Sequence, residues 1–109
     1  MLFISKEDFF EKAAACQRLS REQEKECAVK MAHGDEHARS LIIRSYLPFV
    51  AALVRRQPTE MQTLELIYRF CKALEKAADG FDFAQESETF AHRLSGAFRR
   101  ALVEYIAEK

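Results

Sequence analysis

The sequence predicts an all-α protein that folds as a compact bundle of about five helices. Apolar residues recur at helical spacing along most of the chain, and no segment shows the strict alternation of a half-buried strand. Glycine and proline are scarce, with 3 and 2 residues, which leaves few turn signals for a β-rich fold. Because 109 residues suffice for one hydrophobic core but not for two, we expect a single helical domain over residues 1–109.

The first two helices are expected to begin at capping boxes, in which a serine is followed three residues later by an acid or an amide. Ser5 with Asp8 predicts a short N-terminal helix. Ser20 with Gln23 predicts a second helix, and Gly34 is expected to end it in a left-handed conformation.

The third helix is expected to begin at Asp35, a favourable N-cap residue, and to run to about Gln57. Pro48 lies inside it and removes one backbone hydrogen bond, so we expect a kink between Arg44 and Pro48. The apolar face of this helix is expected to consist of Ile42, Ile43, Tyr46, Leu47, Val50, Leu53 and Val54.

The fourth helix is expected to begin at Thr59, with Gln62 three residues later, to run through Ala78 and to be closed by Gly80. The segment FDFAQESE that follows is expected to be a loop, and Ser87 is the expected cap of the last helix. The apolar seam of the last helix is expected to hold Phe90, Leu94, Phe98, Ala101, Leu102, Tyr105 and Ile106. The residues expected to be buried together are Leu47, Val50, Leu53, Ile67, Leu74, Leu94, Phe98 and Leu102.

Charge is balanced overall but unevenly distributed along the chain. There are 17 basic and 17 acidic side chains, which argues against a protein held to nucleic acid by its bulk charge and leaves only a local patch for that role. Residues 35–58 carry four arginines against two acids, whereas residues 59–86 carry six acids against three basic residues. This pattern suits either two unlike binding surfaces or two helices that attract each other.

The three cysteines are widely spaced in apolar surroundings, which predicts reduced thiols rather than a disulfide framework. No apolar run approaches the roughly 20 residues of a membrane span. The N-terminus MLFISKEDFF lacks the basic start and cleavage site of a signal peptide. We therefore expect a cytoplasmic protein without a membrane contact.

The histidine-rich stretch around Gly34 is the best metal-site candidate, but its spacing is poor. His33, Asp35 and His37 lie near Cys27, yet the two histidines flank the break expected at Gly34, and no CxxC or HExxH pattern accompanies them. We interpret these residues as surface or capping side chains. No Gly-rich phosphate loop or spaced catalytic pairing is present, so we expect no metal, no cofactor, no catalytic residues and no enzymatic activity.

Three stretches of the chain, residues 19–56, 64–83 and 89–102, carry ordered motifs that resemble region 2 of the sigma-70 family of RNA polymerase sigma factors. The first, LSREQEKECAVKMAHGDEHARSLIIRSYLPFVAALVRR, contains the family's L-[ST]-x-E-x-E start and its G-D-x-x-A-R step. LELIYRFCKALEKAADGFDF is similar to the D-L-I, L-x-K-A and F-D pattern, and TFAHRLSGAFRRAL is similar to the helix that captures the promoter −10 element. The resemblance covers roughly residues 19–108, with residues 1–18 as a short helical extension.

The resemblance implies a helical domain that binds the clamp coiled coil of bacterial core RNA polymerase and the −10 element of promoter DNA. The polymerase-binding residues that it implies are Glu65, Tyr68, Arg69, Lys72 and Glu75. The DNA-binding residues that it implies are Phe90, His92, Arg93, Arg99 and Arg100.

Departures from the family pattern leave the function open between alternatives. Tyr68 to Phe70 replace a polar stretch of the polymerase-binding helix, and Arg93, Gly96 and Ala97 stand where relatives carry a tyrosine and paired tryptophans. The chain has no tryptophan, and its 109 residues have no room for the second, helix-turn-helix domain of a promoter-reading sigma factor. It is therefore expected to be either one domain of a longer protein or a stand-alone, diverged sigma-like module. In function, it is either a transcription initiation module or a stand-alone sigma-like module that binds a regulatory protein without melting promoters. A third alternative is that an ordinary helical bundle resembles the family by accident. The basic stripe on the last helix, formed by His92, Arg93, Arg99 and Arg100, is either a DNA-facing surface or a solvated helix face.

Overall fold

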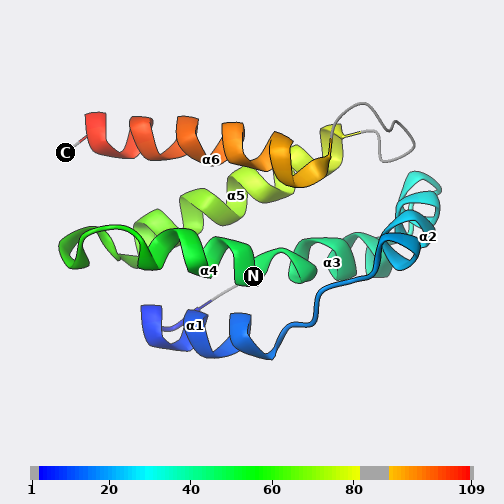
Figure 1. Cartoon of the computed structure of the whole chain (residues 1–109), viewed down its shortest axis with the longest axis horizontal. Coiled ribbons are helices and arrows are strands. Elements are labelled where there is room, and N and C mark those ends of the chain that lie inside the picture. The colour runs from blue at the N-terminus through cyan, green and yellow to red at the C-terminus, as the bar shows by residue number, and fades with distance from the viewer. Residues whose placement is uncertain (1–2, 82–88, 109) are drawn as a thin grey trace.

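The computed structural model describes residues 3–81 and 89–108, and these residues form helices without any strand (Figure 1). The expected all-α class is confirmed. None of the described helices combines the length and the apolarity needed to cross a membrane. The elements are α1 (Lys6–Ala15), α2 (Arg21–Ala32), α3 (Glu36–Ser45), α4 (Leu47–Arg55), the 3-10 helix η1 (Thr59–Met61), α5 (Leu64–Gly80) and α6 (Phe90–Ala107).

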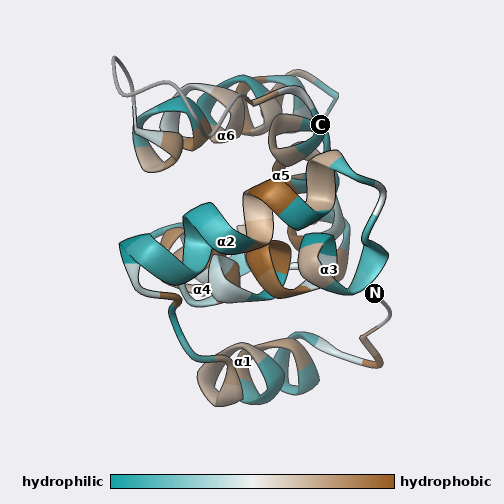
Figure 2. Cartoon of the chain, turned by 90° about the vertical axis from the view of Figure 1, so that its right-hand side faces the viewer, coloured by the Kyte–Doolittle hydropathy of each residue, from teal (hydrophilic) through white to brown (hydrophobic). Residues whose placement is uncertain are grey.

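The helices are arranged around a central layer of α3, α4 and α5. Helices α1 and α6 lie on opposite sides of this layer, with α1 against α4 and α6 packed chiefly on α5 (Figures 1 and 2). Helix α2 packs on α3 at one end of the layer and is strongly hydrophilic, as its teal colour in Figure 2 shows. The α5–α6 pair is the most extensive helix contact in the bundle.

Helix α2 contributes no buried residue, so it is attached through polar and half-buried contacts. The Tyr46 hydroxyl donates to the Glu24 carboxylate at 2.9 Å, which ties α2 to the α3–α4 junction. Burial, followed by the charge of Glu24, raises the pKa of Tyr46, so its hydroxyl keeps the proton that it donates.

Two of the expected helix boundaries are confirmed at the level of individual hydrogen bonds. The Ser20 hydroxyl accepts from the Gln23 amide at 3.1 Å, and the Gln23 side chain accepts from the Ser20 amide at 2.9 Å, which completes the capping box. Gly34 adopts φ +87°, the left-handed conformation that ends α2. The Asp35 carboxylate then caps α3 by accepting from the Ala38 amide at 3.1 Å.

The prediction of a single third helix is wrong, because the helix is interrupted at Tyr46 and divides into α3 and α4. Pro48 has no N–H to donate to the Arg44 carbonyl, and its ring would clash with that carbonyl in a continuous helix. Instead, the amides of Phe49 and Val50 both bond to the Tyr46 carbonyl at 3.1 Å and start a new helix. The expected kink is therefore a complete helix boundary.

The expected start of the fourth helix at Thr59 is also wrong. Residues Thr59–Met61 make one 3-10 turn, and α5 begins only at Leu64. Thr63 is extended and its hydroxyl accepts from the Leu66 amide at 3.2 Å, so Thr63 is the true N-cap. The helix runs to Gly80, two residues beyond the expected Ala78, and its C-cap is Phe81.

The cap of the last helix is Thr89, whose hydroxyl accepts from the His92 amide at 3.2 Å. Ser87, the expected cap, lies outside the described residues, as does most of the expected FDFAQESE loop (residues 82–88).

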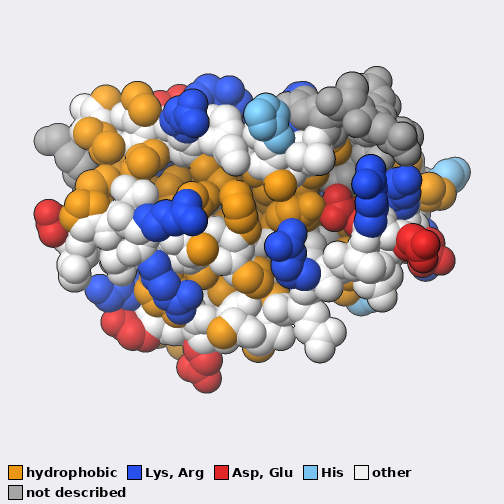
Figure 3. All heavy atoms as spheres, in the orientation of Figure 1, with side chains coloured by type: hydrophobic (Ala, Val, Ile, Leu, Met, Phe, Trp, Pro, Cys, Tyr) orange, Lys and Arg blue, Asp and Glu red, His pale blue; other side chains and the backbone are white. Residues whose placement is uncertain are grey.

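Most of the predicted core is buried in one cluster. Leu53 and Leu102, which were predicted to belong to it, are only half-buried at its edge, because α6 packs chiefly on α5 rather than on α4. In Figure 3, hydrophobic side chains accordingly reach the surface in a band between α6 and α4, with basic side chains along it. The predicted residues that are buried are Leu47, Val50, Ile67, Leu74, Leu94 and Phe98.

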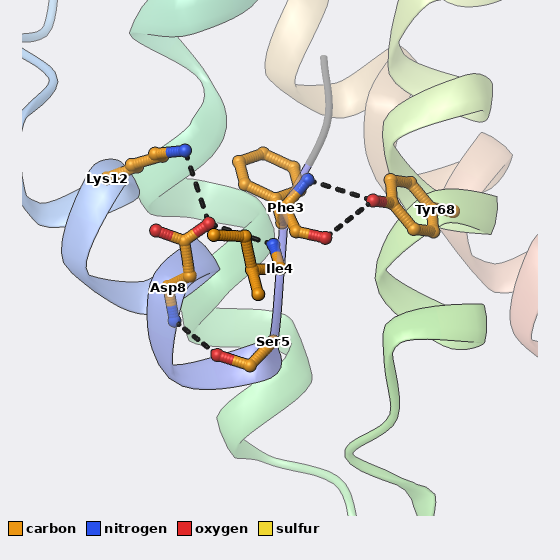
Figure 4. A network of polar contacts seen from close by, with 6 residues as sticks. All are labelled: Phe3, Ile4, Ser5, Asp8, Lys12 and Tyr68. Atoms are coloured by element: carbon orange, nitrogen blue, oxygen red, sulfur yellow. Dashed lines mark hydrogen bonds and ion pairs between the residues drawn. The ribbon is translucent and has the colours of Figure 1, made fainter.

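The N-terminal segment joins this core and departs from the expected capping box. The Ser5 hydroxyl accepts from the Asp8 amide at 3.1 Å, as expected. The Asp8 carboxylate, however, accepts from the amide of Ile4 at 2.9 Å rather than from Ser5, and it also pairs with Lys12 at 3.2 Å (Figure 4). The bond to Ile4 is the main cause of the lowered pKa of Asp8. The Ile4–Asp8 bond holds the extended residues before α1 in place, and the Phe3 side chain points inward and is only 7% exposed.

Candidate functional site

Helix α5 places the predicted polymerase-binding residues on the side away from its buried face. It buries Leu66, Ile67, Phe70, Cys71, Leu74 and Ala78 at i, i+3, i+4 spacing. Glu65 and Lys72 are exposed, and Tyr68, Arg69 and Glu75 are half-buried. The structure brings these five together only in part. Tyr68, Lys72 and Glu75 line one hollow of about 280 Å³, whereas Arg69 and Lys72 line a larger groove between α5 and α6.

Tyr68 is engaged by the chain's own N-terminal segment (Figure 4). Its hydroxyl donates to the Phe3 carbonyl and accepts from the Phe3 amide, both at 2.9 Å. The two rings stack with their centroids 6.1 Å apart. Tyr68 therefore serves as an anchor for Phe3 in this conformation.

Arg69 joins α5 to the C-terminal end of α6. Its guanidinium lies 3.5 Å from the Glu65 carboxylate one turn earlier, and it also pairs with Glu108 after the end of α6. The same group lies 5.7 Å from the centroid of the Tyr105 ring. The bond to Glu108 raises the pKa of Arg69, as expected for a cation between carboxylates. Arg69 thus has a structural role in addition to any binding role.

Phe90, predicted to contact DNA, lies in the core. It is 3% exposed and packs edge-to-face on Tyr46, with ring centroids 4.9 Å apart, and against Phe81 at 5.2 Å. It is the first residue of α6, and its burial fixes the start of that helix against the central layer. The assignment of Phe90 to a DNA-facing surface is therefore corrected.

The predicted basic stripe on α6 is divided between two sides of the helix. Arg93 and Arg100, seven residues apart and hence on one face, line the groove toward α5. His92 and Arg99, also seven residues apart, are exposed but do not line that groove. The structure therefore separates these four residues into two pairs instead of gathering them.

The groove between α5 and α6 is a basic feature that the structure assembles from distant parts of the sequence. Its volume is about 730 Å³. Its basic lining residues are Arg69, Lys72, Lys76, Arg93 and Arg100, and its acid is Glu104. Its small residues are Ala73, Ala77, Gly80, Ala97 and Ala101.

This groove was not predicted from the sequence, although a signal for it is present. Ala73 with Ala77 and Ala97 with Ala101 are two pairs of small residues at i, i+4 spacing, each flanked by basic residues. The i, i+4 relation places each pair on one helix face. Only the packing of α5 on α6 shows that the two faces meet.

Asp79, in the last turn of α5, is paired with a distant arginine. The Arg39 side chain on α3 donates to both Asp79 carboxylate oxygens, at 2.7 and 3.0 Å. This bidentate bond lowers the pKa of Asp79. It is one instance in which the oppositely charged segments 35–58 and 59–86 attract each other.

The remaining chemically suggestive residues have local roles. The Nδ1 atom of His33 lies 2.8 Å from the Val29 carbonyl oxygen, and Asp35 is engaged as a cap. Within residues 3–81 and 89–108, no three His, Cys, Asp or Glu side chains are grouped as metal ligands. Burial raises the pKa of the Cys71 thiol to about 11, so this thiol stays protonated and is a poor nucleophile at neutral pH.

The exposed residues of α5 and α6, and the basic groove between these helices, are thus the surface that best suits a macromolecular partner. No family model matches the chain, and neither does any curated protein or solved structure.

Proposed function

We propose that this chain is a sigma factor-like transcription initiation module, which binds core RNA polymerase through α5 and promoter DNA through α6. The observation that carries the proposal is the gathering of basic side chains from both helices at one groove, in a chain whose net charge is zero. Such a local patch is what a neutral protein needs for contact with phosphates. The ordered resemblance of residues 19–108 to sigma region 2 supports the same function.

The polymerase contact is assigned to the charged side of α5. Glu65 and Lys72 are exposed there and Glu75 is half-buried, so an exposed strip of mixed charge runs along the helix. Charged strips of this kind suit the side of a coiled coil, where complementary charges set partner and register. The partner on this side is the clamp coiled coil of core RNA polymerase.

A pull-down with core RNA polymerase tests this contact. The variant Glu65→Lys/Arg69→Glu exchanges the charges of the pair and keeps their mutual attraction, although it removes the Arg69–Glu108 pair. We expect it to lose co-purification while its circular dichroism stays helical. The matched control is Glu26→Lys/Lys30→Glu on α2, an exposed pair with the same order and spacing. Equal capture of both variants, with unchanged circular dichroism, would place the interface elsewhere.

The DNA contact is assigned to phosphates rather than to bases. The Phe and Tyr residues of α6, Phe90, Phe98 and Tyr105, are all buried, so the His92 imidazole is the one exposed ring that α6 offers to an unstacked base. Arg93, Arg99 and Arg100 are exposed and suit phosphate oxygens. Three phosphate contacts on a single strand imply a log–log salt slope of about −2.

The DNA contact is tested by titrating a −10-like single strand and a scrambled strand at several salt concentrations. Wild type is expected to bind both with similar affinity, in the range of roughly 10⁻⁴ to 10⁻⁶ M typical of non-specific binding. The Arg93→Ala/Arg99→Ala/Arg100→Ala variant is expected to lose this binding. Strong preference for the −10-like strand would contradict the phosphate-only contact. The absence of salt-dependent binding by the wild type would remove DNA from the proposal.

A second candidate is a sigma-like interaction module that binds a regulatory protein without melting promoters. The burial of Phe90 favours it, because α6 then offers no exposed phenylalanine or tyrosine ring to hold a flipped base. The two functions differ in one measurement. Permanganate footprinting of a promoter with core enzyme and this chain shows unpaired thymines for an initiation module and none for an interaction module.

A further inference from the structure

The floor of the groove between α5 and α6 is apolar and made of small side chains. Ala73 and Ala77 contribute from α5, and Ala97 and Ala101 contribute from α6. Small residues at i, i+4 spacing let another backbone approach closely, because no side chain stands between the two. On α5 the lining runs from Arg69 to Gly80, twelve residues whose eleven rises span about 16 Å in an α-helix. This length corresponds to about three helical turns.

The rims of the groove carry positive charge that the described chain leaves uncompensated. Lys72 and Lys76 on α5 and Arg100 on α6 are exposed, and they form no hydrogen bond or ion pair with described residues. Arg93 lies with its guanidinium 6.0 Å from the Phe81 ring centroid at one end. Arg69, bound to Glu65 and Glu108, is already neutralised at the other. Cations facing each other across a groove favour an anionic occupant.

We propose that this groove docks an acidic amphipathic helix of a partner protein. The small-residue face of that helix lies on the alanine floor, and its acidic flanks pair with Lys72 and Lys76 on one rim and with Arg100 on the other. This is the helix-in-groove mode of recognition, with charge complementarity setting the partner. The docking rests on the groove itself. Its regulatory consequence rests on the proposed function, because the helix would cover Arg93 and Arg100 and so compete with promoter DNA.

The floor of the groove suits a protein helix better than the bases of a nucleic acid, whereas Arg93 and Arg100 at its rim are also among the residues proposed to contact DNA phosphates. A single strand needs aromatic faces for its bases, and the residues that line this groove include none. Glu104 lies among the lining residues near the Arg69 end and would repel a phosphate. A helix can instead present a basic or amide side chain to Glu104, because a protein segment carries both signs of charge.

The test uses fluorescence anisotropy with the full chain and three labelled probes. The first is a 15-residue helical peptide with alanines on one face and glutamates on both flanks. The second has the same composition in a permuted order that destroys the amphipathic pattern. The third is a single-stranded oligonucleotide of equal net charge. We expect the amphipathic peptide to bind at least tenfold more tightly than the permuted peptide.

Two variants locate the peptide on the molecule. Lys72→Glu/Lys76→Glu should weaken peptide binding at least tenfold, whereas Lys30→Glu/Arg44→Glu makes the same charge change at exposed residues outside the groove and should have little effect. Ala77→Phe fills the floor without changing any charge and should also abolish binding. If Ala77→Phe fails to fold by circular dichroism, the lysine pair and its control still decide the question.

Three results would overturn the proposal. Equal binding of both peptides would show attraction by diffuse charge alone. Unchanged binding by the Lys72→Glu/Lys76→Glu variant would place the peptide elsewhere. If the oligonucleotide binds and the peptide does not, and if Ala77→Phe abolishes the oligonucleotide binding, the groove would be assigned to nucleic acid. Because the assay contains neither polymerase nor promoter, its failure is separate from a failure of the proposed function.

Discussion

The hydroxyl of Tyr68 on α5 satisfies both main-chain groups of Phe3, 65 residues away, through two bonds of 2.9 Å. Tyr68→Phe removes both bonds and leaves the Phe3 amide and carbonyl without these partners. We expect a loss of about 1 to 2 kcal/mol of unfolding free energy and faster hydrogen exchange at the N-terminal segment. Tyr105→Phe, which loses one bond to Thr63, is the control and should leave exchange at Phe3 unchanged. Equal protection of Phe3 in both variants would contradict the anchoring role.

The packing of α6 is tested at Phe98. This residue is 3% exposed, and its ring centroid lies 5.3 Å from that of Phe70 and 5.9 Å from that of Phe49. Phe98→Ala should therefore lower the free energy of unfolding by about 3 kcal/mol, measured by urea denaturation. Val103→Ala, on the same helix but 60% exposed, should change it by less than about 0.5 kcal/mol. Similar losses in the two variants would mean that α6 does not bury Phe98 in solution.

The Arg39–Asp79 bond predicts a specific dependence of stability on acid pH. Arg39 lowers the pKa of Asp79 in the folded state, so the bond stabilises the fold above the unfolded pKa of about 3.9. That contribution is lost as the pH falls through the lower, folded value. Asp79→Asn should cost under about 1 kcal/mol at pH 7, because both side chains are partly exposed, and should reduce the loss of stability on acidification.

Urea unfolding of wild type and Asp79→Asn at pH 7 and at pH 2.5 measures this effect. A double-mutant cycle with Arg39→Gln isolates the pair from other acids. A difference between the two proteins that is as large at pH 2.5 as at pH 7 would contradict the assignment.

Cys71 should be the slowest of the three thiols to react with Ellman's reagent. Burial raises its folded pKa to about 11, while Cys16 and Cys27 are only half-buried. At pH 8 we expect two faster thiols and a third that reacts only on unfolding in urea, and Cys71→Ala should remove that third phase. The raised pKa of Cys71 also lowers the free energy of unfolding as the pH rises from about 8.5, the pKa of a thiol in the unfolded chain, toward 11. The reason is that the thiol loses its proton first in the unfolded state. Three equal rates in the native protein would show that Cys71 is accessible.

The sequence by itself determined the helical class and those helix ends that depend on groups within a few residues. The Ser20–Gln23 box, the left-handed Gly34 and the Asp35 cap each involve side chains and amides three positions apart or fewer, so local chemistry decides them. The same local rules misplaced the start of α5, because Thr59 and Thr63 are both good caps and only the path of the chain after Pro58 selects between them.

Only the tertiary structure decided which exposed residues lie together on one surface. The spacing on α6 placed Arg93, Arg99 and Arg100 on a polar side, but the position of α5 assigned the first and last to a groove and left Arg99 outside it. Phe90 is apolar and near a helix start, which suits a surface aromatic or a core residue equally well until Tyr46 and Phe81 are packed against it. These outcomes depend on contacts between segments tens of residues apart. Helical periodicity fixes the angle of a side chain around its own axis, but it carries no information on which helix lies beside it.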